Sequence, residues 1–271
     1  MSLVKTVAAA CTTPVTGLSR ACDDVCALWR ARAGVSGLGT GPGTDTPGRP
    51  IRHSGSMSAN NTRGAGGLGR GPDTVRQTIV DRLEGFAHAT ADLTVGVRAA
   101  AVAIAVTSRQ GEYGIWLTKR PSRMREHPGQ FALPGGRLEA SETPAVAALR
   151  EMHEELGVHV DQTQVLGRLD DYTTRSGYVM TPIVCWAGPD RETNPNPGEV
   201  AQLFFIPMSD LMVTPRFISI PESDKPVIQL PLVGSLVHAP TAAVIYQFAE
   251  VVLAGRHTRV DGFEQPVFAW R

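Results

Sequence analysis

This sequence has few cysteines, no long apolar run and no excess of either charge. The four cysteines form neither a paired CxxC motif nor a dense disulfide framework, and no apolar stretch approaches the ~20 residues of a membrane-spanning helix. The 26 Lys and Arg balance the 26 Asp and Glu, so no bulk charge points to nucleic acid or an anionic membrane. We therefore expect a soluble, cytoplasmic monomer or homodimer with no nucleic-acid or membrane partner. An anionic small-molecule substrate stays possible, since a few local arginines and bound cations suffice.

One long stretch near the start of the chain contains almost no large apolar side chains. Between Gly34 and Gly71 it is crowded with Gly, Pro, Ser, Thr and Asn, and such a segment buries too little to offset the entropy of ordering the backbone. Residues 1–71 are therefore predicted to be a disordered, low-complexity extension, and residues 72–271 the globular domain. A later start, for instance at Met57, would explain the same composition.

Beyond the extension, the apolar pattern predicts an α/β fold. Val75, Ile79 and Leu83 recur at spacings of three and four, as in an amphipathic helix. Apolar, β-branched runs predict strands over 99–107, 113–118, 165–171, 179–187 and 200–206, with a hairpin turn at 110–112. Further helices are predicted over 143–156, 207–211 and 240–253. Strands that surround a few helices indicate an α/β sandwich with a mixed sheet.

Three carboxylates gather on the predicted helix 143–156. Glu151 and Glu155 are four residues apart, and Glu154 is three from Glu151, so all three project to one side. Each like-charged pair costs roughly 0.2–0.5 kcal/mol in an isolated helix. A solvated acidic face explains the cluster if nothing else surrounds it.

The neighbouring residues favour a metal site instead. Arg150 adjoins the cluster, and Gly135-Gly136 lies one loop upstream, where the backbone can approach an ion without side-chain obstruction. Several carboxylates with a backbone carbonyl are hard oxygen ligands that suit Mg²⁺ or Mn²⁺, ions that also hold phosphate oxygens. Such a site neutralises phosphate charge and orients a water for in-line displacement.

The spacing of these residues resembles the Nudix box, which runs Gly, five residues, Glu, seven residues, Arg-Glu-apolar-any-Glu-Glu-any-Gly-apolar. Its positions are filled by Gly136, Glu142, Arg150, Glu151, Met152, Glu154, Glu155, Gly157 and Val158. The resemblance implies a Nudix-type α/β/α sandwich with a mixed β-sheet. It also implies that Glu151, Glu154 and Glu155 bind Mg²⁺ or Mn²⁺ with help from the Gly135 carbonyl.

The same resemblance implies roles for the other box residues. Arg150 would orient a box glutamate, and Gly136 and Gly157 would be structural. Glu142 would support the loop and the metal waters, or would act only through favourable charge at the helix start. Glu199 resembles the additional glutamate that many family members carry outside the box. It would be a further ligand, the general base, or an exposed loop charge.

A second signature precedes the box and resembles the coenzyme A pyrophosphatase subgroup. Its positions are filled by Thr118, Arg120, Arg125, Gly129, Pro134, Gly135 and Gly136. Lys119, Arg120 and Arg125 would bind the phosphates of the substrate, or would form a solvated basic turn. The chain departs from this signature at Trp116, Pro121, Leu133 and the stretch 238–241.

The resemblance implies a metal-dependent pyrophosphohydrolase that acts on a nucleoside diphosphate derivative. Coenzyme A or acyl-coenzyme A would be cut to adenosine 3′,5′-bisphosphate and (acyl-)4′-phosphopantetheine, with Glu151 or Glu199 as the base. Two alternatives stay open: hydrolysis of a dinucleotide, nucleotide sugar or damaged nucleotide, and a non-catalytic module that binds a nucleotide. Degenerate modules usually lose box glutamates, and none is lost here.

Overall fold

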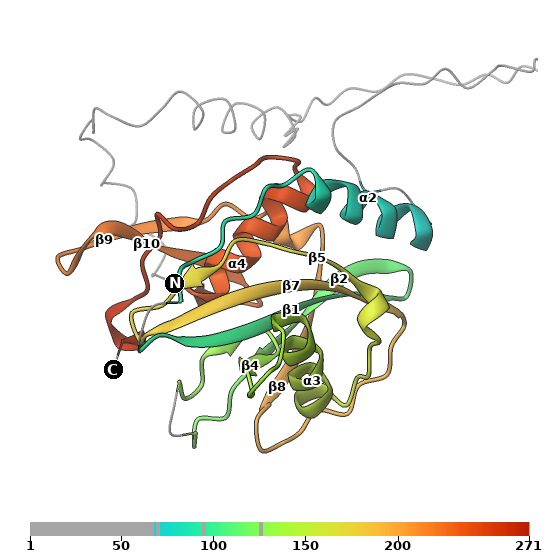
Figure 1. Cartoon of the computed structure of the whole chain (residues 1–271), viewed down its shortest axis with the longest axis horizontal. Coiled ribbons are helices and arrows are strands. Elements are labelled where there is room, and N and C mark those ends of the chain that lie inside the picture. Colours follow the sequence, from blue (N-terminus) through green and yellow to red (C-terminus); the bar gives the residue numbers. More distant parts are fainter. Residues whose placement is uncertain (1–67, 69–70, 94–95, 125–126, 271) are drawn as a thin grey trace, which may run out of the picture. The chain divides into compact units, whose positions relative to one another are not determined.

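A computed structural model of the chain describes residue 68 and residues 71–93, 96–124 and 127–270 (Figure 1). The predicted disordered extension falls almost entirely outside these residues and stays a prediction. In the part that is described, every helix is too short or too polar to cross a membrane.

Eight of the described strands form one mixed sheet. They are β1 (Arg98–Arg109), β2 (Glu112–Lys119), β3 (Phe131–Ala132), β4 (Gly135–Arg137), β5 (Val165–Arg168), β6 (Tyr172–Thr173), β7 (Tyr178–Pro189) and β8 (Gln202–Pro207). Along the main path the order is β3-β2-β1-β7-β5, with β4 also paired to β1, β6 to β7 and β8 to β2. The neighbours β1 and β7 run parallel, and the other pairs run antiparallel.

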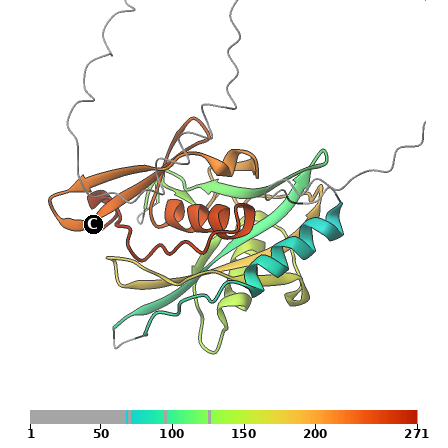
Figure 2. The ribbon, with the colours of Figure 1, turned by 90° about the horizontal axis from the view of Figure 1, so that it is seen from above.

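Helices cover both faces of this sheet, which confirms the predicted α/β/α sandwich. Figures 1 and 2 show α2 (Pro72–Glu84) and α4 (Thr241–Phe248) over one face, and Figure 1 shows α3 (Pro144–Leu156) on the other. The alternation along β1 explains the arrangement, because successive side chains of a strand point to opposite faces. Residues 101, 103 and 105 are alanines in the core beneath α3, whereas Val102, Ile104 and Val106 join the core beneath α2 and α4. The alanines allow α3 to approach the sheet closely.

Local sequence signals set the ends of several elements as predicted. Gln110 and Gly111 both have positive φ, 53° and 81°, as a two-residue hairpin turn of type I′ requires. The Thr143 side chain accepts a hydrogen bond from Val146 N at the start of α3. Gly157 ends the helix in the left-handed conformation, at φ 69°. The helix that carries the box is therefore fixed at both ends.

A second, three-stranded sheet was not predicted. It consists of β9 (Arg216–Ile220), β10 (Ser223–Leu232) and β11 (Ser235–His238), in the order β11-β10-β9. Pro226 and Pro231 lie within β10, and proline removes a ladder donor, so the stretch has a weak strand signal.

Two predicted helices also differ from the structure. The helix expected over 207–211 is wrong: β8 continues to Pro207, and a 3₁₀ turn follows at Asp210–Met212. The helix expected over 240–253 is α4 followed by a π-helical turn at Ala249–Leu253. Its predicted apolar side is buried nevertheless, because packing against the sheet tolerates either helical form.

The last part of the chain returns across the structure as an extended segment, residues 258–270, which we call the C-terminal strap. Gln247 of α4 anchors its beginning: its amide donates to the Asp170 carboxylate at 2.6 Å and to the Thr258 carbonyl at 2.9 Å. Arg259 donates to Asp170 at 2.6 Å. The strap ends in a 3₁₀ turn at Val267–Ala269 and reaches the pocket described next.

Candidate active site

A pocket of about 470 Å³ lies where β1, β4 and α3 meet. Its lining includes Gly135, Gly136, Glu151 and Glu155 of the box segment, Arg120 directly after β2, and Glu199 in the loop before β8. Its size falls in the range of about 300–1,000 Å³ that is usual for small-molecule sites. The carboxylates of two different segments, the α3 helix and the loop before β8, thus face one space.

Glu155 is the most deeply buried of these carboxylates, with 4% of its surface exposed. Burial raises its pKa to about 8, and the Gly135 N–H, which donates to Oε1 at 3.4 Å, and the charge of Arg120 only partly oppose this rise. In an extended strand the N–H and C=O of one residue point to the same side. The Gly135 carbonyl therefore faces the Glu155 side of β4.

Glu151 lies against the backbone of β4. A Cβ atom on Gly136 would be 2.1 Å from Glu151 Oε1, so the glycine is required for the carboxylate to occupy this position. Burial raises the pKa of Glu151, opposed by its hydrogen bond from Arg150, and the charges of Glu154 and Glu199 add to the rise. The charge of Glu199 also contributes to the raised pKa of Glu155.

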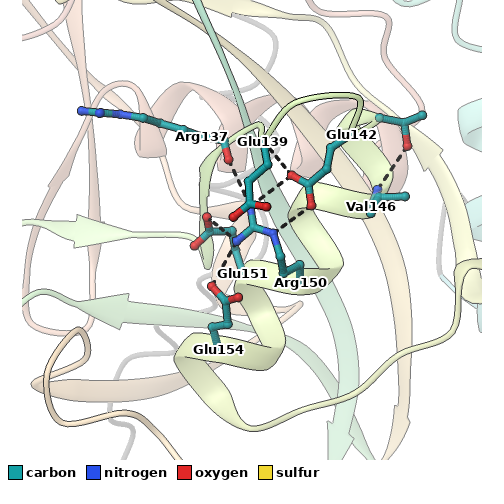
Figure 3. A network of polar contacts seen from close by, with 8 residues as sticks. Arg137, Glu139, Glu142, Val146, Arg150, Glu151 and Glu154 are labelled. Atoms are coloured by element: carbon teal, nitrogen blue, oxygen red, sulfur yellow. Dashed lines mark hydrogen bonds and ion pairs between the residues drawn. The ribbon is translucent and has the colours of Figure 1, made fainter.

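Arg150 donates hydrogen bonds to three glutamates of the box (Figure 3). Its Nε donates to Glu142 Oε1 at 2.8 Å, and its Nη1 donates to Glu151 Oε1 and Glu154 Oε2, both at 3.0 Å. Its Nη2 donates to the Arg137 carbonyl at 3.1 Å. The bond from Arg150 lowers the pKa of Glu142, whose Oε2 also accepts a hydrogen bond from the backbone N–H of residue 139 at 2.8 Å. Glu142 thus holds the loop before α3 against the box arginine.

The structure separates Glu154 from the other predicted ligands. Its side chain is 52% exposed, is paired with Arg150, and is not part of the pocket wall. Successive residues differ by about 100° around a helix, so Glu154 and Glu155 cannot share one direction. The predicted set of Glu151, Glu154, Glu155 and Gly135 is therefore only partly assembled, with Glu154 on the solvent side.

The predicted phosphate-binding residues also differ in position. Arg120 lines the pocket, and its buried Nε lacks a hydrogen-bond partner among the described residues. Lys119 does not line the pocket; its Nζ lies over the Phe131 ring at 5.3 Å from the centroid. Arg125 falls outside the described residues. Of the three, Arg120 alone is placed by the described structure in reach of a pocket ligand.

The oxygen atoms around the pocket suit a hard divalent cation. Carboxylates and a backbone carbonyl are the ligands that Mg²⁺ and Mn²⁺ favour, and buried carboxyls with raised pKa values gain most from a nearby cation. Across the described residues, however, no three acidic, histidine or cysteine side chains are close enough to enclose an ion. Glu151 is instead directed to Arg150.

Other residues that line the pocket were not indicated by the sequence. They include Thr174, Ser176, Tyr178 and Met180 near the start of β7, and Gln265 and Ala269 of the strap. Arg98 Cζ lies 4.0 Å from the centroid of the Tyr178 ring. These residues form no motif, and only the fold brings them beside the box.

Comparison with known proteins identifies the part of the chain that contains the box. The model of the NUDIX domain matches residues 97–229. A curated relative, the uncharacterized Nudix hydrolase NudL of Enterobacter sp. (strain 638), is 37% identical over 121 residues, which are 44% of this chain and 62% of that protein. The peroxisomal coenzyme A diphosphatase NUDT7 of Mus musculus is 29% identical over 142 residues, which are 51% of this chain and 60% of that protein. The matches thus span less than two thirds of these relatives.

Solved structures are similar at a lower level. A NUDIX hydrolase from Alicyclobacillus acidocaldarius has a TM-score of 0.42 and 19% identity over 60% of this chain and 96% of that one. The fold assignment rests on the strand order and layers described above. The complete box and the matching domain model together identify residues 97–229 as a NUDIX domain.

Proposed function

We propose that the chain is a metal-dependent hydrolase of a pyrophosphate linkage in a nucleoside diphosphate derivative, with Mg²⁺ or Mn²⁺ as the cofactor. One observation carries the proposal: Glu151, Glu155, Glu199 and the Gly135–Gly136 backbone line a single pocket that also contains Arg120. A cationic side chain beside a group of carboxylates suits a bound cation together with a phosphate.

Each residue has a distinct task in this reaction. Glu155 and the Gly135 carbonyl would hold the cation, which would supply charge neutralisation for the phosphates and activation of a water. Arg120 donates to a phosphate oxygen, which gives its buried Nε a partner. Glu151 and Glu199 are the candidates to accept the proton of the attacking water, and Arg150 positions Glu151. The hydroxyl of the water joins one phosphorus, the bridging P–O bond breaks, and the other phosphate leaves with that oxygen.

Coenzyme A or an acyl derivative is the proposed substrate. The support is the signature before the box, from Thr118 to Gly136, and the similarity to a relative named as a coenzyme A diphosphatase. The products are adenosine 3′,5′-bisphosphate and (acyl-)4′-phosphopantetheine. The departures at Pro121 and Leu133 lie close to the pocket, where Leu133 is one of the lining residues. A different nucleoside diphosphate derivative is therefore the alternative substrate class.

A substrate panel tests both levels of the proposal. The full chain is incubated with Mg²⁺ or Mn²⁺ and with coenzyme A, NADH, ADP-ribose or a diadenosine polyphosphate, and the products are identified. Turnover of coenzyme A supports the full proposal. Turnover of another member alone refutes the coenzyme A assignment, and turnover of none by the folded protein refutes the hydrolase.

A matched pair of variants tests the site. Glu155→Gln removes the buried charge from the pocket, whereas Glu112→Gln makes the same chemical change at an exposed position at the start of β2. The first should lower kcat by at least about 10²-fold, and the second should leave it unchanged. Equal turnover by both variants would remove Glu155 from the metal site.

A further inference from the structure

One polar side chain that lines the pocket has a fixed orientation and an unused donor. Gln265 of the C-terminal strap is 2% exposed and lines the pocket. Its Oε1 accepts a hydrogen bond of 2.7 Å from the backbone N–H of Arg175. This bond determines which end of the amide is oxygen, because an oxygen must face the N–H.

The amide nitrogen of Gln265 is consequently left for the pocket. Among the described residues, no hydrogen-bond partner is given for Nε2, and this atom is not one of the fully buried unpaired side-chain atoms. The donor therefore reaches the open space of the pocket, although the side chain as a whole is buried. A bound ligand with an acceptor at this place would be its partner.

The strap that carries Gln265 is held firmly beside the pocket. Glu264 accepts hydrogen bonds from Arg175 Nη2 at 2.6 Å and from Ser223 Oγ at 2.9 Å, and it also accepts the backbone N–H of Gln265 at 2.8 Å. Val227 of β10 forms a parallel bridge with Glu264. The donor of Gln265 is therefore preorganised and not carried on a free end.

The surroundings of Gln265 indicate the kind of acceptor. Gln265 is hydrogen-bonded to the backbone of Arg175, and the residues that flank Arg175, Thr174 and Ser176, line the pocket with uncharged side chains. Arg120 belongs to the end that contains the carboxylates, where its charge acts on Glu155. A neutral donor beside uncharged side chains suits an uncharged acceptor better than a phosphate, which would need a cationic partner.

We propose that Gln265 is a specificity-determining residue whose Nε2 donates to an uncharged acceptor on the part of the substrate beyond the diphosphate. This inference rests on the proposed function and deepens it. Two parts of coenzyme A carry such an acceptor, namely the ring nitrogens of adenine and the amide carbonyls of pantetheine. The chemistry is the same, and the choice of ligand separates the two sources.

The test compares ligand affinity with stability in the full chain. Gln265→Met removes the donor at similar size, and Gln265→Glu keeps an oxygen for the Arg175 N–H but replaces the donor. Ser223→Ala is the matched control, because it removes one strap hydrogen bond outside the pocket. Dissociation constants for coenzyme A and ADP-ribose are measured by calorimetry in EDTA, which prevents hydrolysis, and melting temperatures are recorded for each variant.

Both Gln265 variants should weaken binding by about fivefold, the effect of one neutral hydrogen bond, while Ser223→Ala should change it less than twofold. Weaker binding of both ligands assigns the acceptor to adenine, and weaker binding of coenzyme A alone assigns it to pantetheine. Unchanged affinity in Gln265→Met, an equal effect of Ser223→Ala, or no binding of either ligand by the wild type would overturn the inference. Wild-type binding without turnover in Mg²⁺ would instead refute the proposed hydrolase and leave the inference standing.

Discussion

Gly135 and Gly136 are adjacent in sequence, but an alanine should have different consequences at the two positions. It should lower activity at one and stability at the other. A Cβ on Gly136 would lie 2.1 Å from Glu151 Oε1 and 2.4 Å from Glu151 Cδ, which are the end of a flexible side chain. A Cβ on Gly135 would lie 2.4 Å from the Ala101 carbonyl oxygen and 2.7 Å from Val102 Cα. These latter atoms belong to the backbone of β1 and cannot move independently. Gly136→Ala should therefore damage the site, and Gly135→Ala the sheet.

The magnitudes follow from what must move. Neither glycine has positive φ in the structure, so alanine is not excluded by backbone conformation, and a lower entropy of the unfolded chain favours it by about 0.4–1 kcal/mol. Gly136→Ala should thus change the free energy of unfolding by less than about 1 kcal/mol. The displaced Glu151 carboxylate should lower kcat by about 10²-fold, as a misplacement of about 1 Å can. Gly135→Ala should lose about 1–3 kcal/mol or more through overpacking.

Two measurements on each variant separate these effects. Urea denaturation gives the free energy of unfolding, and single-substrate kinetics on the diphosphate that the wild type hydrolyses gives kcat. Glu151→Gln provides a reference for the loss of the carboxylate without a steric change. If Gly136→Ala retained full kcat, or lost as much stability as Gly135→Ala, the inferred contact between Glu151 and β4 would be refuted.

Three further predictions concern stability. Without metal, burial gives Glu155 a pKa of about 8 in the folded state against 4.5 normally, so the folded protein retains a proton that the unfolded chain has released. Its free energy of unfolding should therefore fall as pH rises from about 4.5 to about 8, by up to about 5 kcal/mol. Glu155→Gln should flatten this decline in denaturant titrations, and an unchanged slope would contradict the buried carboxyl. Arg150→Met removes the donor shared by three carboxylates and should lower both kcat and the free energy of unfolding, the latter by about 1–3 kcal/mol; equal stability to the wild type at neutral pH would show that the network contributes little. Gln247→Leu removes the amide that bonds the Asp170 carboxylate and the Thr258 carbonyl, and it should lower the free energy of unfolding, measured thermally, by about 2–3 kcal/mol. Gln202→Leu, the same change at an exposed position, should leave that free energy almost unchanged.

Short-range signals in the sequence predicted the box helix and the hairpin before it. Thr143, Pro144 and Gly157 act on the residues next to them, so the ends of α3 follow from local chemistry. The turn at Gln110–Gly111 likewise depends on two residues. The family pattern named the glutamates, but spacing alone could not show which of them is buried, because that depends on where β4 passes.

Long-range packing determined the features that were missed. The strands of the second sheet contain prolines and exposed residues, so no alternation marks them. The strap has no regular element apart from one 3₁₀ turn, and its position depends on partners such as Asp170 and Arg175, which are about 90 residues earlier in the chain. Gln265 therefore reaches the pocket through contacts that no local pattern encodes.

The pocket is lined by several separate stretches of the chain, among them the box segment at 135–158 and the strap after residue 257. The strap also lies beyond the residues matched by the domain model. A mutation in the strap can therefore alter what the pocket accepts without disturbing the groups that act on the phosphates. Such a division makes ligand preference and bond cleavage separately adjustable, so the strap is a natural region in which to engineer new selectivity.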